Sequence, residues 1–113
     1  MATTYKRLGA IATSGVIATA DTLYTASATA ATSTISSTII VSNTSATAQT
    51  FSLATSATTS FVTAGYIAKD VVIGPNEFYS FTIGLTLDPA CRYLLVSGSS
   101  TAVVASAFGV ENT

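Results

Sequence analysis

The sequence of 113 residues has no histidine, a single cysteine and few charged residues. Without histidine, the chain cannot build a Ser-His-Asp triad, a Cys-His nucleophile pair or most kinds of zinc site. With one cysteine, Cys91, it cannot form an intramolecular disulfide, and we expect that side chain to be a small buried apolar group. We therefore expect no catalytic, cofactor-binding or metal-binding residues.

Charged residues make up 8% of the chain, against about 25% in typical soluble domains. The four basic residues, Lys6, Arg7, Lys69 and Arg92, are too few and mostly too far apart to bind nucleic-acid phosphates. The acidic residues are too scattered for a calcium loop, and no glycine-rich loop has the spacing and lysine of a phosphate site. A low charge leaves little repulsion between copies, which favours a protein that packs against other protein surfaces.

Two carboxylates, Asp70 and Glu77, flank one expected hairpin. A pair of carboxylates can carry acid–base chemistry, but beside a turn the simpler interpretation is two solvated rim residues. Lys69 and Asp70 are adjacent in an expected strand. Because neighbouring side chains of a strand point to opposite faces, we do not expect them to pair.

Several segments of the sequence alternate between apolar and polar residues. Ile35, Ile39 and Val41 fall on one side of an extended segment, and Phe51 and Leu53 repeat the pattern after the polar run 43–48. Since strand side chains point alternately to opposite faces, residues 34–53 are predicted to form two strands joined by a loop.

Alternation predicts a strand at residues 77–85, and short runs between turn or loop segments predict further strands at residues 5–11, 21–25, 66–73, 92–97 and 102–110. The segment Gly74-Pro75-Asn76 is typical of a tight turn, because proline presets one backbone angle and asparagine tolerates the next. The Ala/Ser/Thr runs 26–32 and 54–60 have no apolar periodicity, and we expect them to be connections.

About eight short strands without a convincing helix predict an all-β fold, an antiparallel β-sandwich or jelly-roll-like domain. The length suits one domain with one core. Strand order is left open. The residues expected between the two sheets are Ile35, Ile39, Val41, Phe51, Phe81, Ile83 and Leu95.

Residues 1–20 allow three interpretations, and residues 21–113 are expected to form the single sandwich domain. Two basic residues followed by an apolar run that ends in Ala18-Thr19-Ala20 imitate a signal peptide, although glycine and hydroxyl residues dilute the run. The segment can instead be an arm that packs onto a neighbouring subunit, or an edge strand of the chain's own sheet. No apolar run is long enough to span a membrane. The expected interaction residues are Lys6, Arg7, Leu8, Ile11, Val16 and Ile17.

Several fragments, in their order and spacing, resemble a group of small β-rich virion proteins of tailed phages, notably phages of aquatic bacteria. The fragments are residues 22–25, 39–43, 51–53, 66–73, 81–87 and 107–111. The chain departs from the pattern in its Ala/Ser/Thr-rich loops and at residues 88–91.

The resemblance implies a non-enzymatic structural component of the virion, without cofactors. The first expectation is a capsid decoration (cement) protein, made in the host cytoplasm and bound on the capsid surface, where it stabilises contacts between subunits of the major capsid protein. Its partners would be that protein and its own copies, as a homotrimer, with no nucleic acid, membrane or small-molecule substrate. The alternatives are a tail- or fibre-associated β module involved in receptor binding, and a secreted surface or adhesin domain that would require removal of residues up to about Ala20.

Overall fold

The computed structural model describes residues 3–26 and 33–112, which form eight β-strands and one short 3-10 turn. The strands are β1 (Thr3–Ala12), β2 (Asp21–Thr25), β3 (Ser33–Asn43), β4 (Gln49–Ser56), β5 (Tyr66–Ile73), β6 (Phe78–Leu87), β7 (Tyr93–Gly98) and β8 (Val103–Asn112), and the turn is η1 (Thr63–Gly65). The all-β fold predicted from the alternation is confirmed. Among the described residues, no helix is long and apolar enough to cross a membrane.

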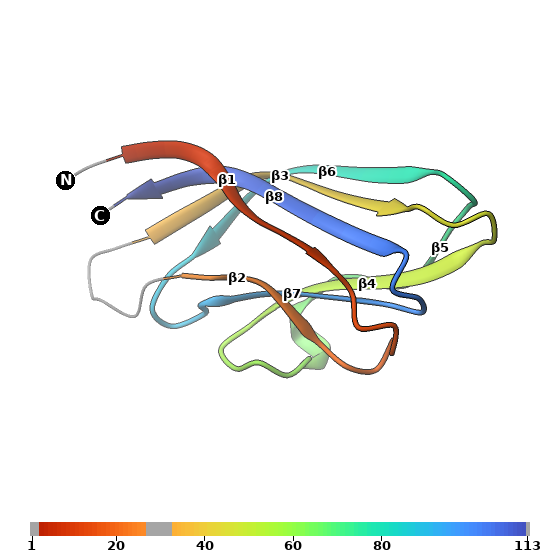
Figure 1. Cartoon of the computed structure of the whole chain (residues 1–113). Helices are drawn as coiled ribbons and strands as arrows, with labels where there is room; N and C mark the ends of the chain where they lie inside the picture. The colour runs from red at the N-terminus through yellow and green to blue at the C-terminus, as the bar shows by residue number, and fades with distance from the viewer. Residues whose placement is uncertain (1–2, 27–32, 113) are drawn as a thin grey trace.

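The strands form two antiparallel four-stranded sheets that lie face to face (Figure 1). Sheet A has the order β1-β8-β3-β6, and sheet B has the order β2-β7-β4-β5. The first strand pairs with the last, the second with the seventh, the third with the sixth and the fourth with the fifth. Folding one long hairpin back on itself gives this order, which is that of a jelly roll. Alternation marks strands and faces but not neighbours, so the sequence could not supply the order.

The core lies between the two sheets. Ile39 and Val41 from sheet A face Phe51 and Leu53 from sheet B, and all four are fully buried. Each such side chain contributes about 1.5–3 kcal/mol when fully buried. Of the expected core residues, Ile39, Val41 and Phe51 are confirmed. Phe81 is partly buried and packs edge-on against Phe51, with 6.1 Å between ring centroids.

Ile35 is not in the core, because β3 contains a β-bulge. Opposite β8, Ser36 pairs with Gly109 and Thr38 with Phe108, so β3 has one extra residue at this point. Such an insertion reverses the face to which the following residues point. Before the bulge the hydroxyl residue Ser36 is buried, and Ile35 is 39% exposed on the outer face.

Matching irregularities cross the neighbouring strands. β1 has an extra residue, Leu8, opposite β8, and β6 shifts register against β3 between Thr82 and Leu85. Ile83 lies within the second shift, outside the core cluster, and is 37% exposed. At the bulge only glycine fits on β8, since a Cβ on Gly109 would lie 2.1 Å from the carbonyl oxygen of Ile35.

Leu95 is fully buried, but it lies outside the core cluster between the sheets, where its neighbours Leu94 and Val96 are found. It belongs to the outer face of sheet B, which the loops 13–20 and 57–65 cover (Figure 1). Close packing there is visible at Gly65, where a Cβ would lie 2.1 Å from the carbonyl oxygen of Thr55. The expected connection 54–60 is therefore partly wrong, because β4 continues to Ser56 and pairs there with β7.

Residues 3–12 form an edge strand of the chain's own sheet. β1 pairs with β8 from Thr3, opposite Asn112, to Ala12, opposite Val104. Residues 13–20 then lead across to sheet B. The connection expected at 26–32 lies outside the described residues, except Ala26, which is buried after the end of β2.

Candidate interaction surfaces

The six expected interaction residues do not form one patch. Leu8 and Ile11 are partly buried and pack against the core cluster, so they belong to the sandwich itself. Arg7 is exposed on the outer side of sheet A, while Val16 is 54% exposed in the loop after β1 and Ile17 is half-buried.

Lys6 takes part in a polar cluster that joins the two sheets at one end of the sandwich. Its ammonium group lies 2.7 Å from a carboxylate oxygen of Glu111, and the hydroxyl of Tyr24 in sheet B donates to the same carboxylate. The Tyr24 hydroxyl also lies 3.0 Å from that of Thr34. The hydrogen bonds from Lys6 and Tyr24 lower the pKa of Glu111, whereas burial, followed by the bond to Glu111, raises the pKa of Tyr24. These groups hold the sheets together and do not form an open site.

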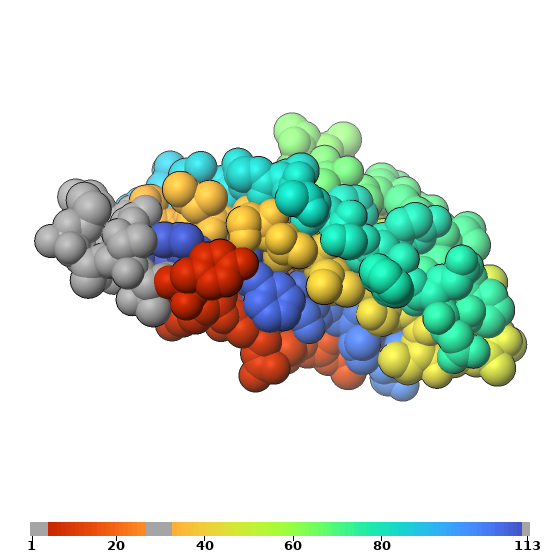
Figure 2. All heavy atoms as spheres, turned by 90° about the horizontal axis from the view of Figure 1, so that it is seen from above, coloured from red at the N-terminus to blue at the C-terminus, as the bar shows by residue number. Residues whose placement is uncertain are grey.

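The outer face of sheet A is not covered by any other part of the chain that the structure describes. Figure 2 looks onto it and shows β1, β8, β3 and β6 side by side, with no other described segment above them. Most of its remaining side chains are Ser, Thr or Ala, and Arg7 is the one charged residue that the described strands place on it. Its apolar side chains, which are exposed or half-buried, are Tyr5, Ile35, Ile40, Phe78, Val104, Phe108 and Val110.

Sheet B differs because its outer face is buried by the chain's own loops. Ser52, Ala54, Leu95 and Ser97 are all at most 3% exposed, although they lie on the side away from the core. The jelly roll is thus asymmetric, with one sheet covered and one open to a partner.

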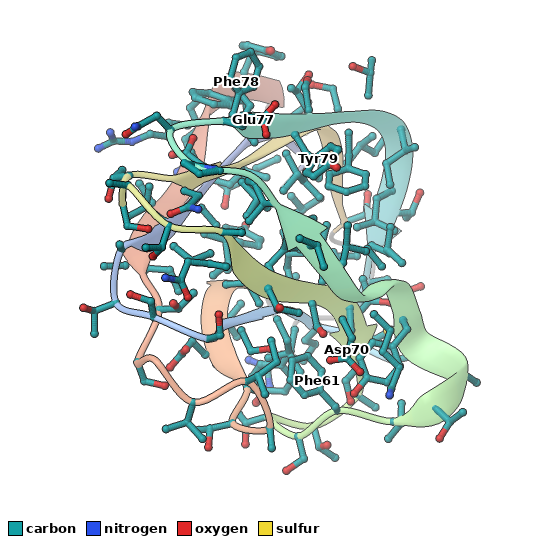
Figure 3. The ribbon with its side chains drawn as sticks, turned by 90° about the vertical axis from the view of Figure 1, so that its right-hand side faces the viewer. Phe61, Asp70, Glu77, Phe78 and Tyr79 are labelled. Atoms are coloured by element: carbon teal, nitrogen blue, oxygen red, sulfur yellow. The ribbon has the colours of Figure 1, made fainter. Side chains whose placement is uncertain are left out.

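A second exposed region is the side of the sandwich formed by β5 and β6, the far edges of the two sheets. Among the residues that the structure describes, eight large apolar side chains are exposed, and five of them lie on β5, β6 or next to η1. They are Val62, Val72, Phe78, Tyr79 and Ile83. Figure 3 looks at the sandwich from one end. In this view Phe78 points outward from sheet A, and Tyr79 points toward the space between the sheets.

The described residues contain no group of three or more potential metal ligands. Asp70 and Glu77 do not come together: Asp70 lies in β5 and Glu77 in the turn beyond its end (Figure 3). Asp70 instead pairs with Lys69 at 3.1 Å, against expectation, because its φ of 50° breaks the strand alternation. Cys91 is half-buried in the turn between β6 and β7 rather than fully buried.

Neither protein-family models, nor curated protein sequences, nor solved structures give a match to this chain. Its function must therefore be inferred from its surfaces.

Sequence reasoning missed both exposed regions. It assigned Ile35 and Ile83 to the core, and the register shifts beside these two residues leave no mark in the alternation. One signal was available on β8, where Val104, Phe108 and Val110 alternate with the small residues Ala105, Ala107 and Gly109. A strand with its larger apolar residues on one face and small ones on the other presents two candidate contact faces.

Proposed function

We propose that this chain is a structural, non-enzymatic protein of a phage virion that decorates the capsid. In this role the outer face of sheet A docks onto neighbouring subunits of the major capsid protein and stabilises the contact between them. The protein would be made in the host cytoplasm and reside on the capsid surface. The observation that carries the proposal is the open face itself, which presents seven apolar side chains and one charge.

Three further points support it. Jelly rolls recur in viral capsid proteins, although a fold alone does not define a function. The resemblance of residues 22–111 to small phage virion proteins points the same way. Apolar surface with few charges is typical of the buried centre of a protein interface, from which charged residues are depleted.

A charge placed in the middle of the open face tests this role. Ser106 lies on the central strand β8 and is half-buried on the outer face. We expect Ser106→Lys to weaken binding to particles that lack the protein by at least about a hundredfold, because an ammonium group would be desolvated without a partner. Thr58→Lys, an exposed position in the loop that covers sheet B, is the matched control. Normal binding of a folded Ser106→Lys protein would exclude this face as the capsid contact.

A tail- or fibre-associated receptor-binding module is the second candidate. Tyr5 is 66% exposed on a face rich in hydroxyl groups, and an exposed aromatic ring can stack on a sugar. Copy number separates the two candidates, since a decoration protein is present in hundreds of copies per particle and a tail module in far fewer. Quantitative gel analysis of purified particles measures it.

The third alternative, a secreted adhesin domain, would require loss of residues 1–20. That loss would remove β1 from sheet A and uncover β8 and the core residues beneath Leu8 and Ile11. We therefore do not favour it.

A further inference from the structure

The four edge strands of the sandwich are not equally protected. An edge strand exposes unpaired N–H and C=O groups, and natural proteins prevent unwanted pairing with short strands, charges, prolines and bulges. β1 carries Lys6 and Arg7 and has the bulge at Leu8. β2 is only five residues long and shifts register after Thr22.

β5 is protected in a different way. It carries Lys69 and Asp70, and the positive φ of Asp70 distorts the strand. The N–H of Asp70 donates to the side chain of Ser52 at 2.9 Å, and the pairing with β4 shifts register twice. An incoming strand would find no regular ladder along β5.

β6 lacks nearly all of these devices. It is ten residues long, contains neither charge nor proline, and its sequence is FYSFTIGLTL. Its one register shift lies beyond Thr82, which leaves residues 78–82 regular. Among the described residues, no strand pairs with its outer edge.

The hydrogen-bonding groups that point toward the free edge can be identified. The N–H of Asn43 donates to the carbonyl of Glu77 at 2.9 Å, so these two residues form a hydrogen-bonded pair. In an antiparallel ladder such pairs alternate with non-hydrogen-bonded ones. Tyr79 and Phe81 therefore bond to β3, while the N–H and C=O of Phe78, Ser80 and Thr82 point away from it.

We propose that β6 pairs in antiparallel fashion with β6 of a second copy, joining the two A sheets into one eight-stranded sheet. With the twofold axis at Ser80, that residue lies opposite itself and Phe78 lies opposite Thr82. About six main-chain hydrogen bonds form in this register. Tyr79 then meets Phe81 in the closer, non-hydrogen-bonded pairing, and aromatic pairs across strands are stabilising.

A second copy suits this surface better than a charged partner. β6 has no charge, so two copies meet there without like-charge repulsion, and Lys69 and Asp70 on the neighbouring strand cancel one another. Such contact would also cover part of the exposed side chains of Tyr79 and Ile83 on β6.

A dimer of this kind does not require the capsid role, and its mass separates it from the expected trimer. Contact between identical edges is closed by a twofold axis, so it produces pairs and not threefold rings. Sedimentation equilibrium of the full chain at about 0.1 mM should give twice the 11.4 kDa chain mass. A monomer or a trimer would overturn the proposal.

Ser80→Pro tests the contact itself. Proline removes only an N–H that points to the free edge, a position that edge strands tolerate, so the sandwich should fold with its β3–β6 pairing intact. We expect the dimer Kd to rise at least about tenfold, while the matched control Ser80→Ala, which keeps the N–H, should dimerise as the wild type does. Undiminished dimerisation of Ser80→Pro would place the interface elsewhere.

Hydrogen exchange on the wild-type chain tests the β6–β6 pairing even if the proline variant fails to fold. The amides of Phe78, Ser80 and Thr82 should become protected as the concentration rises through the Kd. The amide of Thr22 on the edge strand β2 should keep its exchange rate. Rapid exchange of the three β6 amides at all concentrations would refute the pairing.

Discussion

A single buried amide, Asn43, joins the β3–β4 loop to the β5–β6 turn at one end of the sandwich. Its Nδ2 group donates to the carbonyl oxygens of Thr47 at 2.7 Å, Ile73 at 3.2 Å and Gly74 at 3.1 Å. Its Oδ1 atom accepts from the N–H and the hydroxyl of Ser45. With 1% exposure, the side chain has no access to water that could replace these bonds.

We expect Asn43→Ala to lower the free energy of unfolding by about 2–3 kcal/mol, because buried carbonyl groups lose their donor. Asn43→Asp should cost more at neutral pH, since it places a negative charge against the same carbonyl oxygens. Urea denaturation measures both. The control is Thr47→Ala, an exposed side chain in the same loop, which should change stability by less than about 0.5 kcal/mol. Equal effects of Ala and Asp would contradict the assigned donor geometry.

Glu111 should make stability depend on pH. The hydrogen bonds from Lys6 and Tyr24 lower its pKa in the folded state below the ordinary value of 4.5. A lowered folded-state pKa means that the stabilisation is complete above the unfolded pKa and is lost as the pH falls through the folded one. Stability should therefore decline below about pH 4.5.

The variant Glu111→Gln isolates this effect. At pH 7 we expect a loss of about 1 kcal/mol, modest because Lys6 is half-exposed, and a smaller further loss on acidification than in the wild type. Urea denaturation at pH 7 and pH 3 gives both values. Glu77→Gln, an exposed carboxylate in the β5–β6 turn, is the control. An acid response of Glu111→Gln identical to that of the wild type would rule out the assigned role.

Within strand β3, the bulge determines which isoleucine contributes to the core. Ile39 is fully buried, whereas Ile35 is 39% exposed on the outer face. We expect Ile39→Ala to cost about 3–4 kcal/mol and Ile35→Ala less than about 1 kcal/mol. Thermal or urea unfolding of the two variants provides a matched pair. Comparable losses would mean that β3 runs without the bulge.

The strands could be predicted because each is a short local run, alternating or largely apolar, between loop and turn segments, and most of the observed bounds lie within a few residues of those expected. The face to which a residue points could be predicted only where no bulge intervenes, as at Val41 and Phe51 but not at Ile35. A bulge is stabilised by a contact between strands, here Gly109 against the backbone of β3. Such a contact depends on strand order, which local periodicity does not contain.

The same limit applies to the candidate surfaces. The sequence alone does not distinguish an apolar residue in the core from one on an exposed face. Only the three-dimensional arrangement reveals that loops cover sheet B while sheet A and the edge of β6 stay open (Figure 1). Composition could predict one property of the surface, which is its low content of charged residues.

At the scale of the whole molecule, attachment to a particle should resist salt. The chain has nine charged side chains in all, and exposed ion pairs contribute only about 0–1 kcal/mol each. Particles moved to about 1 M salt, where electrostatic screening acts over roughly 3 Å, should keep the protein. Moderate urea, which weakens apolar contacts, should release it. Release by salt alone would point to ionic attachment.

The remaining prediction concerns residues 1–20, which the sequence left as an arm, an edge strand or a leader. β1 pairs with β8 along its length, Leu8 and Ile11 pack against the core, and Lys6 binds Glu111. A chain that starts at Asp21 would lose these contacts and expose β8 as a new edge beside the core. We therefore expect it to lack a cooperative unfolding transition by circular dichroism, whereas the full chain unfolds cooperatively. If the shortened chain folds but no longer binds particles, the segment acts as an arm. If it folds and binds normally, β1 is dispensable and the leader interpretation gains support.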